Sequence, residues 1–274
     1  MQRPAIALFY FLLLVSGVLV VILLPSYQLK SATSSCSPTS RRVVYGELHH
    51  VGSSYGGHSY LPNLVSNESV IYSVGLGNDV TWDLGVIERH ACTVFGFDNT
   101  PEHMKFYRDR RDKLPREFKH NSYLLTPTDK TVKMALPRGH GISFSQLDAD
   151  VRGFKENSYV ELPGKCLSTI MRELGHSHID ILKLDVEGAE YELIESFQQT
   201  RPVICQILIE FHDRLFREGF ELKRRAFKTL LGLGYEISYV GFESSDPDGG
   251  VSFFHPSHCC VSSPRVCQMI SLLD

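Results

Sequence analysis

The fold of this 274-residue chain is decided by the segment Ile179–Glu190, which reads IDILKLDVEGAE. Its first half is a short apolar run rich in β-branched residues, which is typical of a buried strand. Asp185 ends the run, Gly188 allows a turn, and Ala189 begins a predicted helix. A strand, an acidic residue at its carboxyl end, a glycine turn and a helix form half of a βαβ unit. Ligands of open α/β sheets bind outside the carboxyl ends of the strands, so Asp185 is either a site residue or a cap of the following helix.

A second strand–turn–helix pattern begins with the predicted strand Val70–Val74 and continues through a turn that contains Gly75 and Gly77. Such a turn allows a ligand to approach the backbone and the amino terminus of the next helix. The next predicted strand ends at Asp98, and an acidic residue about 20 positions after the glycine can accept hydrogen bonds from ribose hydroxyls. The third glycine of a dinucleotide site is missing, because Asp79 stands there. The pattern therefore favours a nucleoside cofactor without a pyrophosphate, such as S-adenosylmethionine, over an ordinary βα turn.

The sheet continues after the quoted segment. Val203–Phe211 is predicted as another buried strand, with Glu210 at its carboxyl end and His212 directly after it. Tyr235–Val240 and Val251–His255 alternate like a closing antiparallel pair. Strands and helices that alternate and end in such a pair predict an α/β fold with a doubly wound, mostly parallel sheet and a terminal antiparallel hairpin.

The amino terminus carries a different signal. Residues Ala5–Leu24 are uncharged and almost entirely apolar, and about 20 helical residues span the core of a bilayer. We expect a single transmembrane signal anchor here, after a short tail at 1–4. We then expect a stem over 25–50, a globular domain over 51–262 and a C-terminal tail over 263–274. An uncleaved anchor most often sends the following domain to the lumen of the endoplasmic reticulum or Golgi, whereas cleavage of the apolar segment would give a secreted protein.

The composition excludes some classes of protein. The net charge is −3, so no global field attracts nucleic acid. The seven cysteines contain no Cys-x-x-Cys pair, so a zinc ribbon is not expected. Cys36 lies in a Ser/Thr-rich stretch of the predicted stem and is a candidate for a disulfide-linked dimer, for an intrachain disulfide or for a free thiol. The sequon Asn67–Ser69 fits a lumenal glycoprotein.

The motifs resemble a known family. Leu182–Glu190 resembles the signature of the FkbM-type S-adenosylmethionine-dependent methyltransferases, and Tyr72–Asp83 with Val94–Pro101 resembles one subgroup of that family. The resemblance extends from about Ile71 to about Phe254. It implies that the predicted sheet is of the Rossmann-like methyltransferase kind and that the cofactor is S-adenosyl-L-methionine.

The resemblance also implies where the cofactor binds, namely near Gly75, Gly77 and Asp98. Many methyltransferases carry an acidic residue two positions before the first glycine, where it holds the amino group of the methionine part. Ser73 stands at that position here. Ser73 and Asp79 are therefore the two candidates for that contact.

The predicted catalytic residues are Asp185, Glu210 and His212, which follow neighbouring strands. Methyl transfer is an in-line displacement that depends on alignment of the reactants, and an alcohol acceptor gains from a nearby base. An ordinary histidine pKa is about 6.5, which suits His212 for this role near neutral pH. A divalent-metal site made by the same three side chains is the less favoured hypothesis, and no metal ligand is assigned.

The expected function is O-methylation of a hydroxyl acceptor, either a glycan or a small molecule, in the secretory pathway. Ser73 motivates an alternative, a catalytically silent lumenal binding protein that retains the methyltransferase fold. A nicotinamide-dependent oxidoreductase is disfavoured by the missing third glycine.

Overall fold

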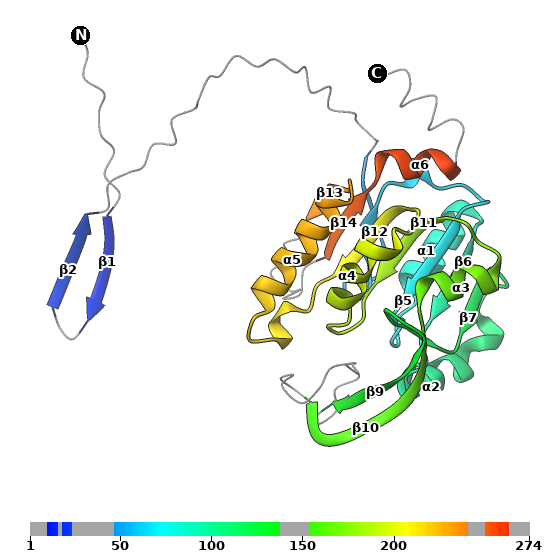
Figure 1. Ribbon diagram of the computed structural model, residues 1–274, viewed down its shortest axis with the longest axis horizontal. Coiled ribbons are helices and arrows are strands. Elements are labelled where there is room, and N and C mark those ends of the chain that lie inside the picture. Colours follow the sequence, from blue (N-terminus) through cyan, green and yellow to red (C-terminus); the bar gives the residue numbers. More distant parts are fainter. Residues whose placement is uncertain (1–9, 16–17, 24–46, 138–153, 241–249, 263–274) are drawn as a thin grey trace, which may run out of the picture. The chain divides into compact units, whose positions relative to one another are not determined.

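The computed structural model of the chain divides into two compact units, Met1–Arg42 and Val43–Asp274, which are considered separately (Figure 1). The residues that the structure describes are 10–15, 18–23, 47–137, 154–240 and 250–262. The predicted tails at 1–4 and 263–274, and most of the predicted stem with Cys36, lie outside them.

The larger unit is built on a seven-stranded sheet with the strand order β13-β14-β12-β11-β5-β6-β7. The five strands from β12 to β7 are parallel, and β14 is antiparallel to both β12 and β13. The structure therefore has a mixed α/β fold with a mostly parallel central sheet that closes in an antiparallel pair of strands, as predicted. The strands are β5 (Val70–Val74), β6 (Thr93–Phe97), β7 (Phe118–Asn121), β11 (Ile179–Leu184), β12 (Ile204–Glu210), β13 (Glu236–Val240) and β14 (Gly250–Phe254).

Helices cover both faces of this sheet, because alternate side chains of the central strands point to opposite faces. Leu182 belongs to a core that includes side chains of α3, α4 and α5, and Figure 1 shows α4 and α5 side by side. Ile181 belongs to a second core with α1, against which side chains of α2 pack. The helices are α1 (Thr81–His90), α2 (Pro101–Arg110), α3 (Leu167–Leu174), α4 (Glu190–Thr200), α5 (Gly219–Gly232) and α6 (Pro256–Ser262).

Two smaller sheets and three short 3-10 helices complete the described part of this unit. The hairpin of β3 (His49–Val51) and β4 (His58–Tyr60) lies against the central sheet, where the Ser252 hydroxyl donates to the Ser59 carbonyl oxygen at 2.6 Å. The remaining elements are the sheet of β8 (Leu124–Leu125), β10 (Phe154–Lys165) and β9 (Lys130–Pro137), and the 3-10 helices η1 (Pro62–Leu64), η2 (Arg111–Lys113) and η3 (Asp213–Leu215).

The smaller unit differs from the predicted transmembrane helix over Ala5–Leu24. β1 (Tyr10–Val15) pairs with β2 (Val18–Leu23) in an antiparallel register. The run is rich in valine, and β-branched residues favour strands, whereas apolarity alone does not separate a strand from a helix. In the part of the chain that the structure describes, no helix combines the length and the apolar character needed to cross a membrane.

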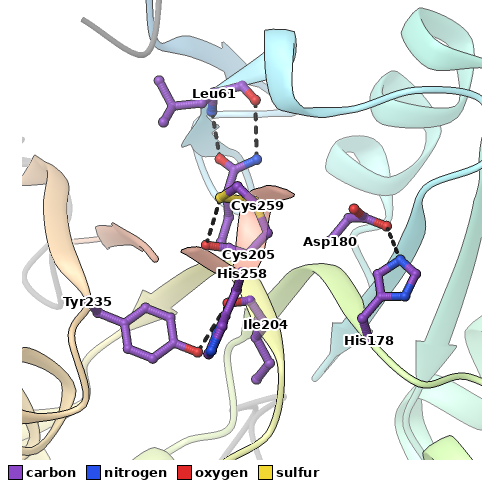
Figure 2. The surroundings of a disulfide bond; sticks show 9 residues. Leu61, His178, Asp180, Ile204, Cys205, Tyr235, His258 and Cys259 are labelled. Carbon is purple, nitrogen blue, oxygen red and sulfur yellow. Dashed lines mark hydrogen bonds and ion pairs between the residues drawn. A yellow bond between two sulfur atoms is a disulfide. The ribbon is translucent and has the colours of Figure 1, made fainter. Parts of the chain in front are cut away.

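A disulfide joins Cys205 of β12 to Cys259 of α6 (Figure 2). Next to it, the Tyr235 hydroxyl donates to the Ile204 carbonyl oxygen at 3.2 Å, and His258 Nδ1 lies 3.2 Å from the same oxygen. The cross-link therefore holds α6 against the amino-terminal end of β12.

We expect the double substitution Cys205→Ala/Cys259→Ala to lower the free energy of unfolding. The bond closes a loop with a sequence separation of 54 residues, and loss of that constraint on the unfolded chain costs about 4 kcal/mol. Equilibrium urea unfolding of the two proteins measures the difference, and Cys166→Ala, which removes a free thiol, is the matched control. Equal unfolding midpoints for the double variant and the unsubstituted chain would contradict the prediction.

Candidate active site

A cleft opens at the carboxyl ends of β5, β6 and β11, where Rossmann-like sheets bind their ligands. The glycine turn after β5 forms one wall, and the turn after β11 forms another. Its lining residues are Tyr55, Gly56, Val74, Gly75, Leu76, Gly77, Asp79, Phe97, Asp98, Thr100, Leu124, Leu125, Met134, Asp185, Val186 and Glu187.

Gly75 and Gly77 have different structural roles in the turn. Both have positive φ values, +79° at Gly75 and +50° at Gly77, which disfavour other residues. A Cβ atom on Gly75 would lie 1.6 Å from the carbonyl oxygen of Asp185, whereas a Cβ atom on Gly77 would meet no heavy atom of the described residues within 4 Å. Gly75 therefore serves the packing of two strand ends, and Gly77 leaves open space in which a ligand can approach the backbone.

Asp98 holds the glycine turn in place. It is only 5 % exposed, and its Oδ2 accepts hydrogen bonds of 3.0 Å from the backbone N–H groups of Leu76 and Gly77. Its Oδ1 accepts two hydrogen bonds of 2.8 Å, from the backbone N–H and the hydroxyl of Thr100. The predicted contact of Asp98 with ribose would therefore add to a structural role that the sequence did not reveal.

Two histidines pack against this turn, and neither could be identified as a site residue from the sequence. His103 is fully buried in α2, and its Nδ1 donates to the Gly77 carbonyl oxygen at 2.7 Å. His120 stacks on His103 with ring centroids 5.0 Å apart, and its Nε2 lies 3.1 Å from the Asp98 carbonyl oxygen. Burial and the neighbouring His103 lower the pKa of His120 to about 4, so its ring is neutral. Nothing in the local sequence of this polar helix marks His103 as buried.

The two candidates for the methionine amino group lie in different places. Ser73 is fully buried in β5 and is absent from the cleft lining, so the structure does not support it as a cofactor contact. Asp79 lines the cleft, and its carboxylate accepts hydrogen bonds from the Ser53 hydroxyl and, at 2.8 Å, from the Thr81 backbone N–H. Burial raises the pKa of Asp79, but these hydrogen bonds outweigh it and lower the pKa, which keeps Asp79 charged.

The three predicted catalytic residues meet at one point. His212 Nε2 lies 3.7 Å from Asp185 Oδ1 and 3.8 Å from Glu210 Oε1. Glu187, which the sequence analysis did not single out, joins them with its Oε2 3.7 Å from the same nitrogen. Lys183 Nζ lies 3.6 Å from Asp185 Oδ2. We refer to Asp185, Glu187, Glu210 and His212 as the acidic cluster.

Glu190, the first residue of α4, fixes the position of His212. Its buried carboxylate accepts hydrogen bonds of 2.8 Å from the backbone N–H groups of Gly188 and His212, and Oε1 lies 3.4 Å from His212 Nδ1. Burial lowers the pKa of His212, but the carboxylates of Glu190, Glu187 and Asp185 outweigh burial and raise the pKa to about 10. The expected pKa near 6.5 is therefore wrong for this structure, because His212 is a cation at neutral pH and not a free base.

A second cleft lies on the other side of the acidic cluster. Tyr55 lines both clefts, and Glu210 lines the second one. His58, only 4 % exposed, also lines it, with Nε2 4.0 Å from Glu210 Oε2. Burial, together with the charges of Lys183 and His50, holds the pKa of His58 well below its usual value. The acidic cluster thus reaches the first cleft through Asp185 and the second through Glu210.

Comparison with known proteins identifies the family of the chain. Residues 52–237 match the family model described as the methyltransferase FkbM domain. The chain belongs to the FkbM methyltransferase family. As a member of this family it is an S-adenosylmethionine-dependent methyltransferase, and the predicted cofactor is confirmed. The open space at Gly77, beside Asp98, fits the approach of this cofactor to the turn.

Distant similarities connect the chain to solved structures. Fibrillarin from Aeropyrum pernix, with natively bound S-adenosyl-L-methionine, is 14% identical over 69% of this chain and 67% of that chain, with a TM-score of 0.37. Precorrin-6y C5,15-methyltransferase from Geobacter metallireducens is 10% identical over 70% and 81%, with a TM-score of 0.38. An rRNA methylase from Streptococcus thermophilus is 13% identical over 71% and 90%, also with a TM-score of 0.38. No curated protein matches the chain.

The different tasks of the two glycines can be tested by substitution. We expect Gly75→Ala to destabilise the protein by about 3 kcal/mol, because its Cβ would overlap the Asp185 carbonyl. Gly77→Ala is expected to cost only about 1 kcal/mol of stability, yet to weaken S-adenosylmethionine binding at least about tenfold because its methyl group enters the open space. Urea unfolding and titration calorimetry measure the two effects. Equal losses of stability in both variants would refute the division of roles.

Asp98→Asn tests the acid that holds the turn. The amide nitrogen cannot accept a hydrogen bond from a backbone N–H. Where it takes the place of Oδ2, the hydrogen bonds from the Leu76 and Gly77 N–H groups are lost at a buried position. We expect S-adenosylmethionine affinity to fall by about tenfold to a hundredfold, measured by calorimetry. Asp112→Asn, at a 93% exposed side chain, is the control and should bind normally. Unchanged affinity in Asp98→Asn would show that the turn does not need this carboxylate.

Proposed function

We propose that this chain is an O-methyltransferase that transfers the methyl group of S-adenosylmethionine to a hydroxyl of a glycan or small molecule. The observation that carries the proposal is the position of the acidic cluster between the cofactor cleft and the second cleft. A methyl donor in one cleft and an acceptor in the other would meet at Asp185 and Glu210.

The proposed reaction is an in-line displacement. When bound, the cofactor supplies an electrophilic methyl group on a sulfonium. The acceptor oxygen forms the new O–C bond, the C–S bond breaks with its electron pair moving to sulfur, and the hydroxyl proton leaves to a carboxylate. Asp185 and Glu210 are the proposed proton acceptors, and alignment of the reactants provides most of the acceleration. His212, charged and fixed by Glu190, positions both carboxylates.

The second cleft supports a hydroxyl-rich acceptor. It combines the aromatic rings of Tyr55 and Tyr239 with the polar side chains of His50, His58 and Glu210. Aromatic faces pack against apolar C–H groups, and the polar groups exchange hydrogen bonds with hydroxyls. A sugar offers both kinds of surface, so we favour a glycan acceptor.

A location in the secretory pathway is part of the proposal. The Cys205–Cys259 disulfide supports it, because such bonds persist in oxidising compartments. Asn67 of the sequon is exposed, which is what a glycosylation site requires. The uncharged run Ala5–Leu24 would act as the targeting segment. We further propose that the protein resides in the lumen of the endoplasmic reticulum or Golgi and forms a dimer linked through Cys36.

We also propose that the chain belongs to the subgroup described as methyltransferase-like protein 24. The support is the resemblance of Tyr72–Asp83 and of Val94–Pro101 to that subgroup. The alternative of a catalytically silent binding protein was motivated by Ser73. In the present proposal Asp79, which lines the cleft, makes the contact with the methionine amino group that Ser73 would not make.

The test compares cofactor binding with turnover in the full chain. We expect Asp185→Asn to lower methyl transfer to an oligosaccharide acceptor by about a hundredfold or more, while S-adenosylmethionine affinity changes less than about threefold. Radiolabelled methyl transfer and calorimetry measure these quantities, and Glu221→Gln, at a half-exposed side chain on α5, is the matched control. Cofactor binding without turnover on any hydroxyl acceptor would restore the silent alternative, and absence of cofactor binding would overturn the proposal.

A further inference from the structure

Three side chains at the junction of the two clefts have the chemistry of metal ligands. Asp185 follows β11, Glu210 ends β12, and His212 comes two residues later. The parallel pairing of the two strands brings their carboxyl ends together. One potential ligand atom from each of the three residues lies within 4.8 Å of the others.

The separations within this group are better suited to a bound ion than to direct hydrogen bonds. His212 Nε2 lies 3.7 Å from Asp185 Oδ1 and 3.8 Å from Glu210 Oε1, whereas hydrogen bonds from nitrogen to oxygen measure about 2.7 to 3.2 Å. Two ligands on one ion with bonds of about 2.1 Å lie about 3.0 to 4.2 Å apart. The observed distances fall in that range.

A buried histidine provides an independent observation. His58 is 4 % exposed, and its Nε2 has no hydrogen-bond partner among the residues that the structure describes. This nitrogen points toward the cluster, 4.0 Å from Glu210 Oε2. A buried imidazole nitrogen without a partner carries a free-energy cost that a ligand would remove.

The charge around the junction also favours a cation. The carboxylates of Asp185, Glu187 and Glu210 all lie within 3.8 Å of a single imidazole nitrogen. Protonated His212 and Lys183, whose Nζ lies 3.6 Å from Asp185 Oδ2, offset part of this negative charge. A divalent cation in place of the His212 proton would offset more of it.

We propose that Asp185, Glu210 and His212 bind one divalent transition-metal ion of the Mn²⁺ or Zn²⁺ type, with His58 as an additional nitrogen donor beside Glu210. The ion would take the place of the proton on His212 Nε2, which is released to solvent on binding, while Nδ1 keeps its contact with Glu190. An imidazole among the ligands suits such ions, whereas Mg²⁺ and Ca²⁺ prefer oxygen ligands alone. Three protein ligands leave coordination positions open. The ion would hold the acceptor oxygen at the junction of the two clefts. This role, though not the binding itself, rests on the proposed O-methyltransferase function.

The test is a titration of the full chain with Mn²⁺ after treatment with EDTA, followed by the electron paramagnetic resonance signal of free Mn²⁺. We expect one ion per chain, displaced by Zn²⁺ but not by equimolar Mg²⁺ or Ca²⁺. Glu210→Gln and His212→Gln are each expected to weaken binding at least about a hundredfold through loss of one ligand, whereas Asp112→Asn should bind normally.

Calorimetric titration with S-adenosylmethionine in the same samples separates this proposal from the proposed function. Retained cofactor affinity in Glu210→Gln, with loss of Mn²⁺ binding, would support the metal site and show that the variant is folded. Normal cofactor binding with no saturable Mn²⁺ or Zn²⁺ binding up to about 1 mM, the weakest range of protein cation sites, would overturn the metal site alone. Equal affinity for Mg²⁺ and Mn²⁺ would overturn the role of the imidazole as a ligand.

Discussion

The close approach of Gly75 to the carbonyl oxygen of Asp185 is the constraint on which the site depends. No side chain fits between the two strand ends, and the Asp185 backbone N–H donates to the Val74 carbonyl oxygen at 3.0 Å. The contact places the turn that receives the cofactor directly beside the acid that begins the catalytic cluster. Asp98 and Glu190 then fix the two turns through backbone N–H groups. Both halves of the site are thus positioned mainly by backbone contacts.

Much of this arrangement could be predicted from the sequence, because its signals are local. The apolar runs before Asp98, Asp185 and Glu210 identify parallel strands, and an acidic residue after such a run lies at the edge where ligands bind. The glycine turn could be placed for the same reason. Its two glycines could not be told apart, since the contact that closes one of them comes from a strand about 110 residues later, at a separation that only the folded topology reveals.

Features that depend on distant partners could not be predicted. The proton of His212 is held by carboxylates in the turn after β11 and at the start of α4, so the ordinary pKa of histidine did not predict its charge. Ser73 and Asp79 are six residues apart, but only the direction of each side chain decides which one reaches the cleft. The pairing of Cys205 with Cys259 could not be predicted, because nothing in the local sequence distinguishes Cys259 from the other cysteines. The strands of the amino-terminal unit could not be predicted either, because an apolar run of this composition is compatible with a strand and with a helix.

The disulfide has a practical consequence for handling the protein. It fastens the amino-terminal end of β12, whereas the acidic cluster begins at the opposite end of this strand, and five residues from Cys205 to Glu210 extend roughly 16 Å. Reduction would therefore loosen α6 at a site remote from the reacting groups. Material made in a reducing bacterial cytoplasm should be less resistant to heat and proteases and yet retain an intact catalytic end, so low yield from such a host would not imply a damaged enzyme.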